Sequence, residues 1–367
     1  MESVDLEKTK SFPSLTPSGG FNDCIIPFLD NDNNPLVAMR AMVSQQLTYQ
    51  HDALRALSDI SRQLILVADK SELNDYFESE FGISIVAYCW IWMLLLTQHI
   101  EYTSDSFETN ILNLLTGSQN CLTPSDIYNF FKHFSLSAVE MPRFFEGFTT
   151  YDADFSSHFY DSPLKQKPFL FTGNGLRTIS TNLATSSASF LLPHIFKTAN
   201  SRVIASKFKA VFTTAFEDHI GTILSTTHLT HLDEDQIKDL YRSFGTSGKR
   251  KNVVDHLLIL EDSKKILLIE SKGVEQTDFV KTILDEETLT KRLEGSHIKG
   301  VFQSQQCIKI LSGSDKYSDF EFFSFIITND DFGFNSAQQL LDMLGEKAFT
   351  STEFPVDIDS PWTGFGS

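Results

Sequence analysis

The chain has 367 residues, a length that suggests two domains or one large domain. Hydrophobic residues make up 41% and charged residues 21% of the sequence, which is ordinary for a soluble globular protein. The net charge of −18 excludes attraction of nucleic acid by the chain as a whole. Any nucleic acid must therefore meet a local basic patch, a partner subunit or a metal.

Cysteine usage and the apolar runs bear on location. The four cysteines are far apart and show no C-x-x-C spacing, and the first residues lack the basic start of a signal peptide. We therefore expect a reducing, cytoplasmic location. The most apolar run, residues 85–96, is shorter than the roughly 20 residues that span a bilayer. It predicts a buried helix, and we expect no membrane association.

The first 200 residues divide into three segments. Residues 1–35 are rich in Ser, Pro, Gly, Asn and Asp, which is typical of a loosely ordered arm. Apolar residues at three- and four-residue spacing then predict a helical domain over 36–150. Its helices are expected at 36–67, 71–81, 85–100, 107–115, 123–134 and 137–148. Residues 151–200 are expected to bridge to the next domain and to contain a β-hairpin around Gly173-Asn174-Gly175.

Residues 201–345 form the second predicted domain. Apolar residues at helical spacing favour a helix over 201–224, and later patterns predict a helix at 299–311, a strand at 320–328 and a helix at 336–344. The charged stretch around 285–292 is expected to form a loop or short helices. Residues 346–367 are expected to be a loosely held acidic tail.

A charged hairpin stands at the centre of this domain. Two apolar runs, 257–260 and 266–269, flank a charged turn and predict two buried strands. Side chains alternate along a strand, so Glu270 and Lys272 should lie on one face. If the strands pair around the turn, Asp255 comes close to Glu270. Two carboxylates and a lysine can hold a divalent cation and stabilise charge on a phosphate.

This pattern resembles the PD-(D/E)XK nuclease superfamily, in which an acidic residue opens one strand and an acidic-x-Lys set follows on the next. The matching residues are Asp255 and Glu270-Ser271-Lys272, with Val254 where the family has a proline. The resemblance covers about residues 200–330. It implies a helical N-terminal domain followed by a restriction-endonuclease-like mixed β-sheet core flanked by helices, within an α+β or α/β fold.

The resemblance also implies roles for these residues. Asp255, Glu270 and the backbone carbonyl of Ser271 would hold Mg²⁺ or Mn²⁺. Lys272 would orient or deprotonate the attacking water, or stabilise the phosphate. The family often adds an acidic residue from the helix before the first core strand, and Glu217 matches that place. Gln303 and Gln306, one turn apart, are accessory candidates, and the sequence does not decide between them. Surface carboxylates and a polar helix face remain the alternatives.

Two further charged or imidazole clusters are open to two interpretations each. Lys249, Arg250 and Lys251 are either the patch that contacts nucleic acid or a solvated loop. His228 and His231, with His219 upstream, could suggest zinc, but the sequence shows no further ligands at a defined spacing. Ordinary histidines are therefore favoured.

Three functions remain open. The first is a metal-dependent nuclease that hydrolyses phosphodiester bonds, with DNA favoured over RNA, and the resemblance implies a bacterial defence or accessory effector. The second is an inactive nuclease-like module that binds proteins or nucleic acid. The third is a helical interaction protein whose hairpin is incidental. In each, the helical N-terminal domain could bind a protein partner or a second copy of the chain.

Overall fold

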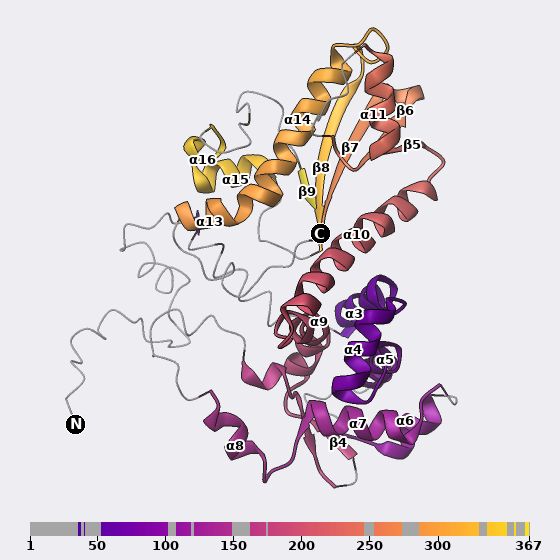
Figure 1. Cartoon of the computed structure of the whole chain (residues 1–367), viewed down its shortest axis with the longest axis vertical. Helices are drawn as coiled ribbons and strands as arrows, with labels where there is room; N and C mark the ends of the chain where they lie inside the picture. The colour runs from indigo at the N-terminus through magenta and orange to yellow at the C-terminus, as the bar shows by residue number, and fades with distance from the viewer. Residues whose placement is uncertain are drawn as a thin grey trace, which may run out of the picture. The chain divides into compact units, whose positions relative to one another are not determined.

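The structure is a computed structural model with a mixed α+β fold and a helical N-terminal region (Figure 1). It describes residues 36–37, 40, 53–101, 108–118, 121–148, 162–173, 175–245, 253–273, 286–329, 336–350, 356 and 364–366. The chain forms two compact units. One comprises residues 46–219, and the other joins residues 1–45 to residues 220–367.

The unit of residues 46–219 is mainly helical. Its helices are α3 (Ala53–Val67), α4 (Ser71–Phe81), α5 (Ile85–Glu101), α6 (Ile111–Gly117), α7 (Pro124–Phe134), α8 (Met141–Glu146) and α9 (Thr181–Lys197). Helix α10 (Arg202–Ser225) begins in this unit and ends in the other. Thr123 caps α7 through a capping box with Asp126, with proline in the first turn, as the sequence predicts.

A small mixed sheet completes the helical unit. Its strands are β1 (Glu108–Asn110), β2 (Ser135–Leu136), β3 (Phe169–Phe171) and β4 (Gly175–Thr178), in the order β1-β4-β3-β2. The β3–β4 hairpin confirms the predicted turn, but its strands pair with β1 and β2 of the helical unit. The segment 151–200 therefore does not act as a separate bridge in its described part. Residues 108–110, expected to be helical, are instead a strand, because they pair with β4.

Aromatic side chains form the core of the helical unit. Trp92 and Tyr88 of α5 are fully buried, and Trp92 packs against Phe130 of α7 and Phe169 of β3. This confirms that the apolar run at 85–96 is a largely buried helix. Among the residues described, no single helix is long and apolar enough to cross a bilayer. Helices α4 and α5, bent by 71°, meet that test only as a pair, by length and composition.

The other unit is built on a five-stranded mixed sheet. Its strands are β5 (Thr230–Asp233), β6 (His256–Leu260), β7 (Lys265–Lys272), β8 (Glu321–Thr328) and β9 (Gly364–Gly366), in that spatial order. The pairs β5–β6 and β6–β7 are antiparallel, whereas β7–β8 and β8–β9 are parallel. Strand β9 lies in the predicted acidic tail. Part of that tail is thus held in the sheet.

Helices α11 (Glu234–Ser243) and α14 (Lys299–Ser312) pack against this sheet (Figure 1). The unit also contains the helices α13 (Glu286–Leu293), α15 (Ala337–Leu344) and α16 (Glu346–Thr350). A π-helical turn, η5 (Glu294–Ile298), joins α13 to α14. Helix α14 contributes Cys307 and Leu311 to a core with Leu257, Ile266 and Leu268 of the hairpin.

A second core of this unit gathers residues from both ends of the chain. Val37, which the sequence assigns to the helical domain, is buried with Leu289, Ile298, Ile326 and Phe349. Phe349 belongs to α16, in the segment expected to be a loose tail. The predicted boundaries at 36 and 346 therefore cut through a packed core, because its apolar residues come from segments that are distant in sequence.

Candidate functional site

The predicted hairpin is present with the register that the sequence suggests. His256 pairs with Ile269 and Leu260 with Lys265, around the short turn η4 (Glu261–Ser263). Continued by one residue, this register sets Asp255 opposite Glu270. Leu257, Ile259, Ile266 and Leu268 share one buried face, so alternation extends that face to Asp255 and Glu270.

Asp255 is tied to the end of β7. Its Oδ2 atom accepts a hydrogen bond of 2.6 Å from the backbone N–H of Ser271. Asp255 directly precedes β6, whose pairing with β7 begins at His256. The Ser271 N–H is therefore bound by the Asp255 carboxylate and not by a backbone carbonyl of β6. The bond brings the Asp255 carboxylate to the backbone that carries Glu270 and Lys272.

Glu270 is a buried carboxylate with one neighbouring cation. Its side chain is 1% exposed, and its Oε1 atom accepts a hydrogen bond from Nζ of Lys272, whose side chain is 14% exposed. The other oxygen, Oε2, is buried and has no hydrogen-bond partner among the described residues. An unpaired buried carboxylate oxygen is costly, so it points to a ligand that supplies the missing interaction.

The electrostatics of both carboxyl groups reflect this burial. Burial raises the pKa of Glu270 to about 7, with Asp255 adding to the rise and Lys272 and Lys299 opposing it. Burial also raises the pKa of Asp255, against the Ser271 hydrogen bond and Lys272. The charge of Asp255 thus opposes ionisation of Glu270, an effect that a bound cation would reverse.

The donor set fits a hard divalent cation. Oxygen ligands are those that Mg²⁺ and Mn²⁺ prefer, and Mg²⁺ is commonly held by one or two carboxylates while keeping several waters. Asp255 and Glu270 supply that number. In the part of the chain that the structure describes, no group of three or more His, Cys, Asp or Glu side chains could hold a metal. The role of the Ser271 carbonyl stays a prediction.

Helix α14 packs against β7 and β8 on the face of the sheet that carries Glu270. Gly300 lies so close that a Cβ atom there would be 3.5 Å from Cγ of Glu270 and 2.7 Å from Cδ1 of Ile326. Gln303 is buried and donates a hydrogen bond of 2.8 Å to the carbonyl of Val253, two residues before Asp255. Gln306 is only half-buried. Of the two glutamines, Gln303 is therefore the one that the structure joins to the segment leading into Asp255.

Four further predicted residues lie elsewhere in the chain. Glu217 lies on α10, in the part that belongs to the helical unit, and is half-buried. Its role stays a prediction. Lys249, Arg250 and Lys251 lie outside the described residues.

Three groups near the site were not singled out from the sequence. Glu234, at the start of α11, raises the pKa of Asp255, and Lys299 lowers the pKa of both carboxyls. His297, in η5, is 1% exposed, and burial followed by the charge of Lys272 lowers its pKa to about 3. A π-helical turn is rare and is often found at functional sites, but single-sequence patterns do not reveal one.

His231, one of the two histidines of the 228–231 segment, has a partner that the sequence did not suggest. His231 of β5 lies with its Nε2 atom 3.3 Å from Nδ1 of His256 on β6. The side chain of His256 also packs against Gly221. Because His256 and Asp255 are neighbours on an extended segment, their side chains point to opposite faces. The imidazole pair is thus separate from the carboxylates.

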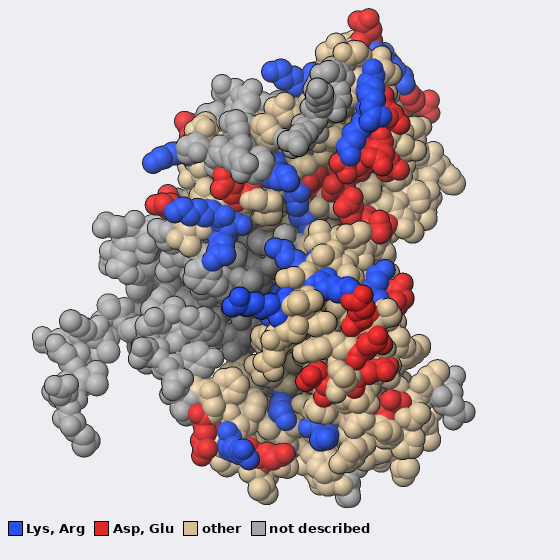
Figure 2. All heavy atoms as spheres, viewed as in Figure 1, with Lys and Arg blue, Asp and Glu red and all other residues tan. Residues whose placement is uncertain are grey.

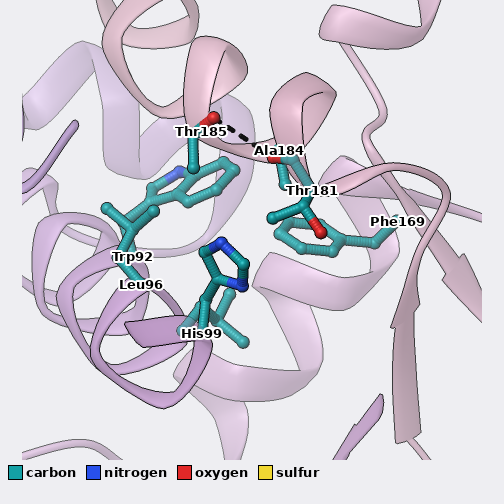
Figure 3. A pocket seen from close by; sticks show the side chains of 8 residues that line it. Trp92, Leu96, His99, Phe169, Thr181, Ala184 and Thr185 are labelled. Atoms are coloured by element: carbon teal, nitrogen blue, oxygen red, sulfur yellow. Dashed lines mark hydrogen bonds between the residues drawn. The ribbon is translucent and has the colours of Figure 1, made fainter. Parts of the chain in front are cut away.

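A small cavity lies in the helical unit. It is lined by α5, β3 and α9, with Trp92, His99, Phe169 and Thr185 around it (Figure 3). On the α9 wall, the Thr185 hydroxyl donates a hydrogen bond of 3.1 Å to the Thr181 carbonyl, so this hydroxyl is already hydrogen-bonded within the helix. Its walls are mostly apolar core side chains, so it belongs to the packing of the unit.

The surface carries both signs of charge, and on the face drawn in Figure 2 acidic side chains lie next to basic ones. Helix α11 carries the ion pairs Glu234–Lys238 and Asp239–Arg242. Ion pairs of this kind neutralise charge locally on the surface. The electrostatics of the site therefore depend mainly on Asp255, Glu270 and Lys272.

Comparison with known proteins adds no assignment. No family model matches the chain, and no curated protein or solved structure is significantly similar to it.

Proposed function

We propose that this protein is a metal-dependent nuclease that hydrolyses phosphodiester bonds of nucleic acid, DNA in preference to RNA. The observation that carries the proposal is the grouping at the end of the hairpin. Asp255 is bound to the backbone of Ser271, and Glu270 is buried beside Lys272 with one oxygen unpaired. Two carboxylates and a lysine in this arrangement are suited to holding Mg²⁺ or Mn²⁺ next to a phosphate.

The order of elements supports a restriction-endonuclease-like core. Helix α10 precedes the sheet, the β6–β7 hairpin carries the carboxylates, α14 follows and packs on β7 and β8, and β8 extends the sheet. This is the order that the resemblance to PD-(D/E)XK nucleases implies. In this order of elements, Asp255 directly precedes β6, and Glu270 and Lys272 lie at the end of β7.

Each residue has a separate task in the proposed reaction. When bound, a divalent cation supplies positive charge beside the phosphate and makes a bound water more acidic. Asp255 and Glu270 would hold that cation, and the Ser271 amide fixes the Asp255 carboxylate. Lys272 would donate to the attacked phosphate or orient the water. Helix α14 excludes solvent from the Glu270 side.

A cleavage assay with matched variants tests the proposal. Plasmid DNA, linear DNA and RNA are incubated with the protein and Mg²⁺, with EDTA as a control. Glu270→Gln and Lys272→Met should each abolish cleavage while leaving the circular dichroism spectrum unchanged. Lys316→Met, an exposed lysine of the same unit, should cut as wild type. Wild-type rates from Lys272→Met would overturn the mechanism, and activity in Glu270→Gln would point to a contaminant.

One observation favours a second function, an inactive nuclease-like module. Lys272 pairs with Glu270, and a buried ion pair of this kind can hold the end of the strand in place without any catalysis. The module would then bind proteins or nucleic acid without cutting. Calorimetry with Mg²⁺ or Mn²⁺ separates the two functions. A nuclease should bind the cation as wild type and lose that binding in Glu270→Gln, whereas an inactive module needs no cation.

The biological role proposed is that of a bacterial defence or accessory effector in the cytoplasm. The helical unit would sense a trigger or bind a protein partner or a second copy of the chain. Size-exclusion chromatography with light scattering tests self-association. Removal of residues 46–219 is not a suitable test, because α10 continues from that unit into the other.

A further inference from the structure

The site contains a second lysine, on α14, that the proposed chemistry has not used. Lys299 is the first residue of α14 and is half-buried. Residues four apart lie on one side of a helix, so Lys299 shares its side with Gln303. Gln303 donates to the Val253 carbonyl, and this side of α14 therefore faces the segment that leads into Asp255.

The neighbour of Lys299 fixes how near the helix comes. Gly300 allows α14 to approach Glu270, since a Cβ atom there would be 3.5 Å from the Cγ atom of Glu270. Lys299 thus begins the helix whose next residue, Gly300, lies over Glu270, and it shares a side with Gln303, which is bound to Val253. The positive charge of Lys299 is also near enough to lower the pKa of both Asp255 and Glu270.

Among the described residues, two basic side chains act on the two carboxylates. Asp255 and Glu270 are opposed by Lys272 and Lys299, while Glu234 is paired with Lys238 at 2.8 Å. The buried His297 is neutral near pH 7, because burial lowers its pKa to about 3. One divalent cation would therefore give the group a net positive charge. A positive group is what a phosphodiester needs in a chain whose net charge is −18.

We infer that Lys299 is a phosphate-contacting residue, which binds a backbone phosphate of the nucleic acid beside the phosphate that Lys272 and the metal act upon. The inference rests on the proposed nuclease function and assigns the substrate contact within it. Lys299 contributes to substrate binding, whereas Lys272 contributes to the chemical step. Phosphate contacts of this kind position the nucleic acid without reading its sequence.

The test compares Lys299→Gln with Lys299→Arg and with Lys309→Gln, which removes the same charge from an exposed position on the same helix. Binding of a short fluorescein-labelled DNA duplex is followed by anisotropy in Ca²⁺ over a series of salt concentrations. Lys299→Gln should weaken binding several-fold and lower the salt dependence by about one phosphate contact. Lys299→Arg should bind nearly as wild type, and Lys309→Gln should be unchanged.

Kinetics with Mg²⁺ provide the second measurement. Lys299→Gln should raise KM several-fold and leave kcat within about twofold, since a uniform binding contact changes KM alone. Equal binding by Lys299→Gln and wild type, or equal losses in Lys299→Gln and Lys309→Gln, would overturn the inference alone. So would a fall in kcat at unchanged KM. A wild-type protein that neither binds nor cuts nucleic acid overturns the proposed function, and the inference with it.

Discussion

The carboxylate of Asp255 and the backbone amide of Ser271 are joined by a hydrogen bond of 2.6 Å, although sixteen residues separate them. The bond links the segment before β6 to the end of β7. It holds the Asp255 carboxylate beside the backbone of Ser271, the residue that follows Glu270. The same carboxylate thus serves the fold and the proposed metal site, and substitutions can separate the two tasks.

Asp255→Asn and Asp255→Ala should differ in stability but agree in loss of metal binding. Asparagine keeps an oxygen that accepts from the Ser271 amide, whereas alanine leaves that buried N–H unpaired at a cost of about 1–3 kcal/mol. Urea unfolding should therefore show a lower midpoint for the alanine variant only. Calorimetry should show weak or no Mg²⁺ binding for both. Equal stability of the two variants would mean that the hydrogen bond contributes little.

Glu270 should make the metal-free protein less stable as pH rises from 4.5 to 7. The pKa of Glu270 is raised from 4.5 to about 7 in the folded state, so within this window the folded protein binds more protons than the unfolded chain. Its contribution is fully present below pH 4.5 and is lost as pH passes 7. The loss amounts to at most about 3 kcal/mol. Urea unfolding at several pH values in EDTA measures it.

Glu270→Gln is the control for that slope. It cannot titrate, so the difference in unfolding free energy between wild type and variant should change across the window in favour of the variant. Above pH 7, Mg²⁺ should restore stability to wild type and not to the variant, because cation and proton compete for one carboxylate. Parallel pH curves for the two proteins would contradict the raised pKa.

Gly300→Ala should destabilise the sheet unit even though alanine favours helix by about 1 kcal/mol. The new Cβ atom would lie 2.7 Å from Cδ1 of the fully buried Ile326, and overpacking of this kind costs about 1–3 kcal/mol. Ile326→Val removes that methyl group, so Gly300→Ala should cost less in the Val background. A double-mutant cycle by urea unfolding measures the coupling.

Gly295→Ala is the matched control for Gly300→Ala. Gly295 lies in the preceding π-helical turn, with no atom near the place that a Cβ would take. Its substitution should be neutral or slightly stabilising. If both glycines behaved alike, helix propensity and not the close approach of α14 to Glu270 and Ile326 would explain the result.

The central hairpin could be predicted because its signals are local. Two apolar runs around a short charged turn leave few registers, and the observed pairing of His256 with Ile269 follows from them. The nearness of Asp255 to the residues around Glu270 then follows from alternation and register alone. The presence of α10, α14 and β8 could also be read from apolar spacing.

The parts that were missed depend on contacts between distant segments. Strand β9 forms against β8, and β1 forms against β4, although neither sequence has a strong strand pattern. Helix α9 is rich in Ser and Thr and contains Pro193, which hid its helical character. Gly300 is buried because α14 packs on the sheet and brings this residue to Glu270 and Ile326. His297 is buried in η5, a π-helical turn that the sequence does not predict.

Gly175→Ala should destabilise the helical unit strongly, because β1 and β4 approach there without room for a side chain. A Cβ atom at Gly175 would overlap the carbonyl oxygen of Thr109 and lie 2.9 Å from the Cα atom of Asn110. Both are backbone atoms, so the clash is relieved only by opening the β1–β4 pairing. Gly173→Ala is the control. It has a φ of 88° with open space around it, and should cost only the left-handed strain of about 1–2 kcal/mol. Urea unfolding followed by tryptophan fluorescence measures both, since Trp90 and Trp92 lie on α5 of this unit. A larger loss from Gly173→Ala than from Gly175→Ala would show that turn conformation, and not strand approach, governs the stability of this sheet.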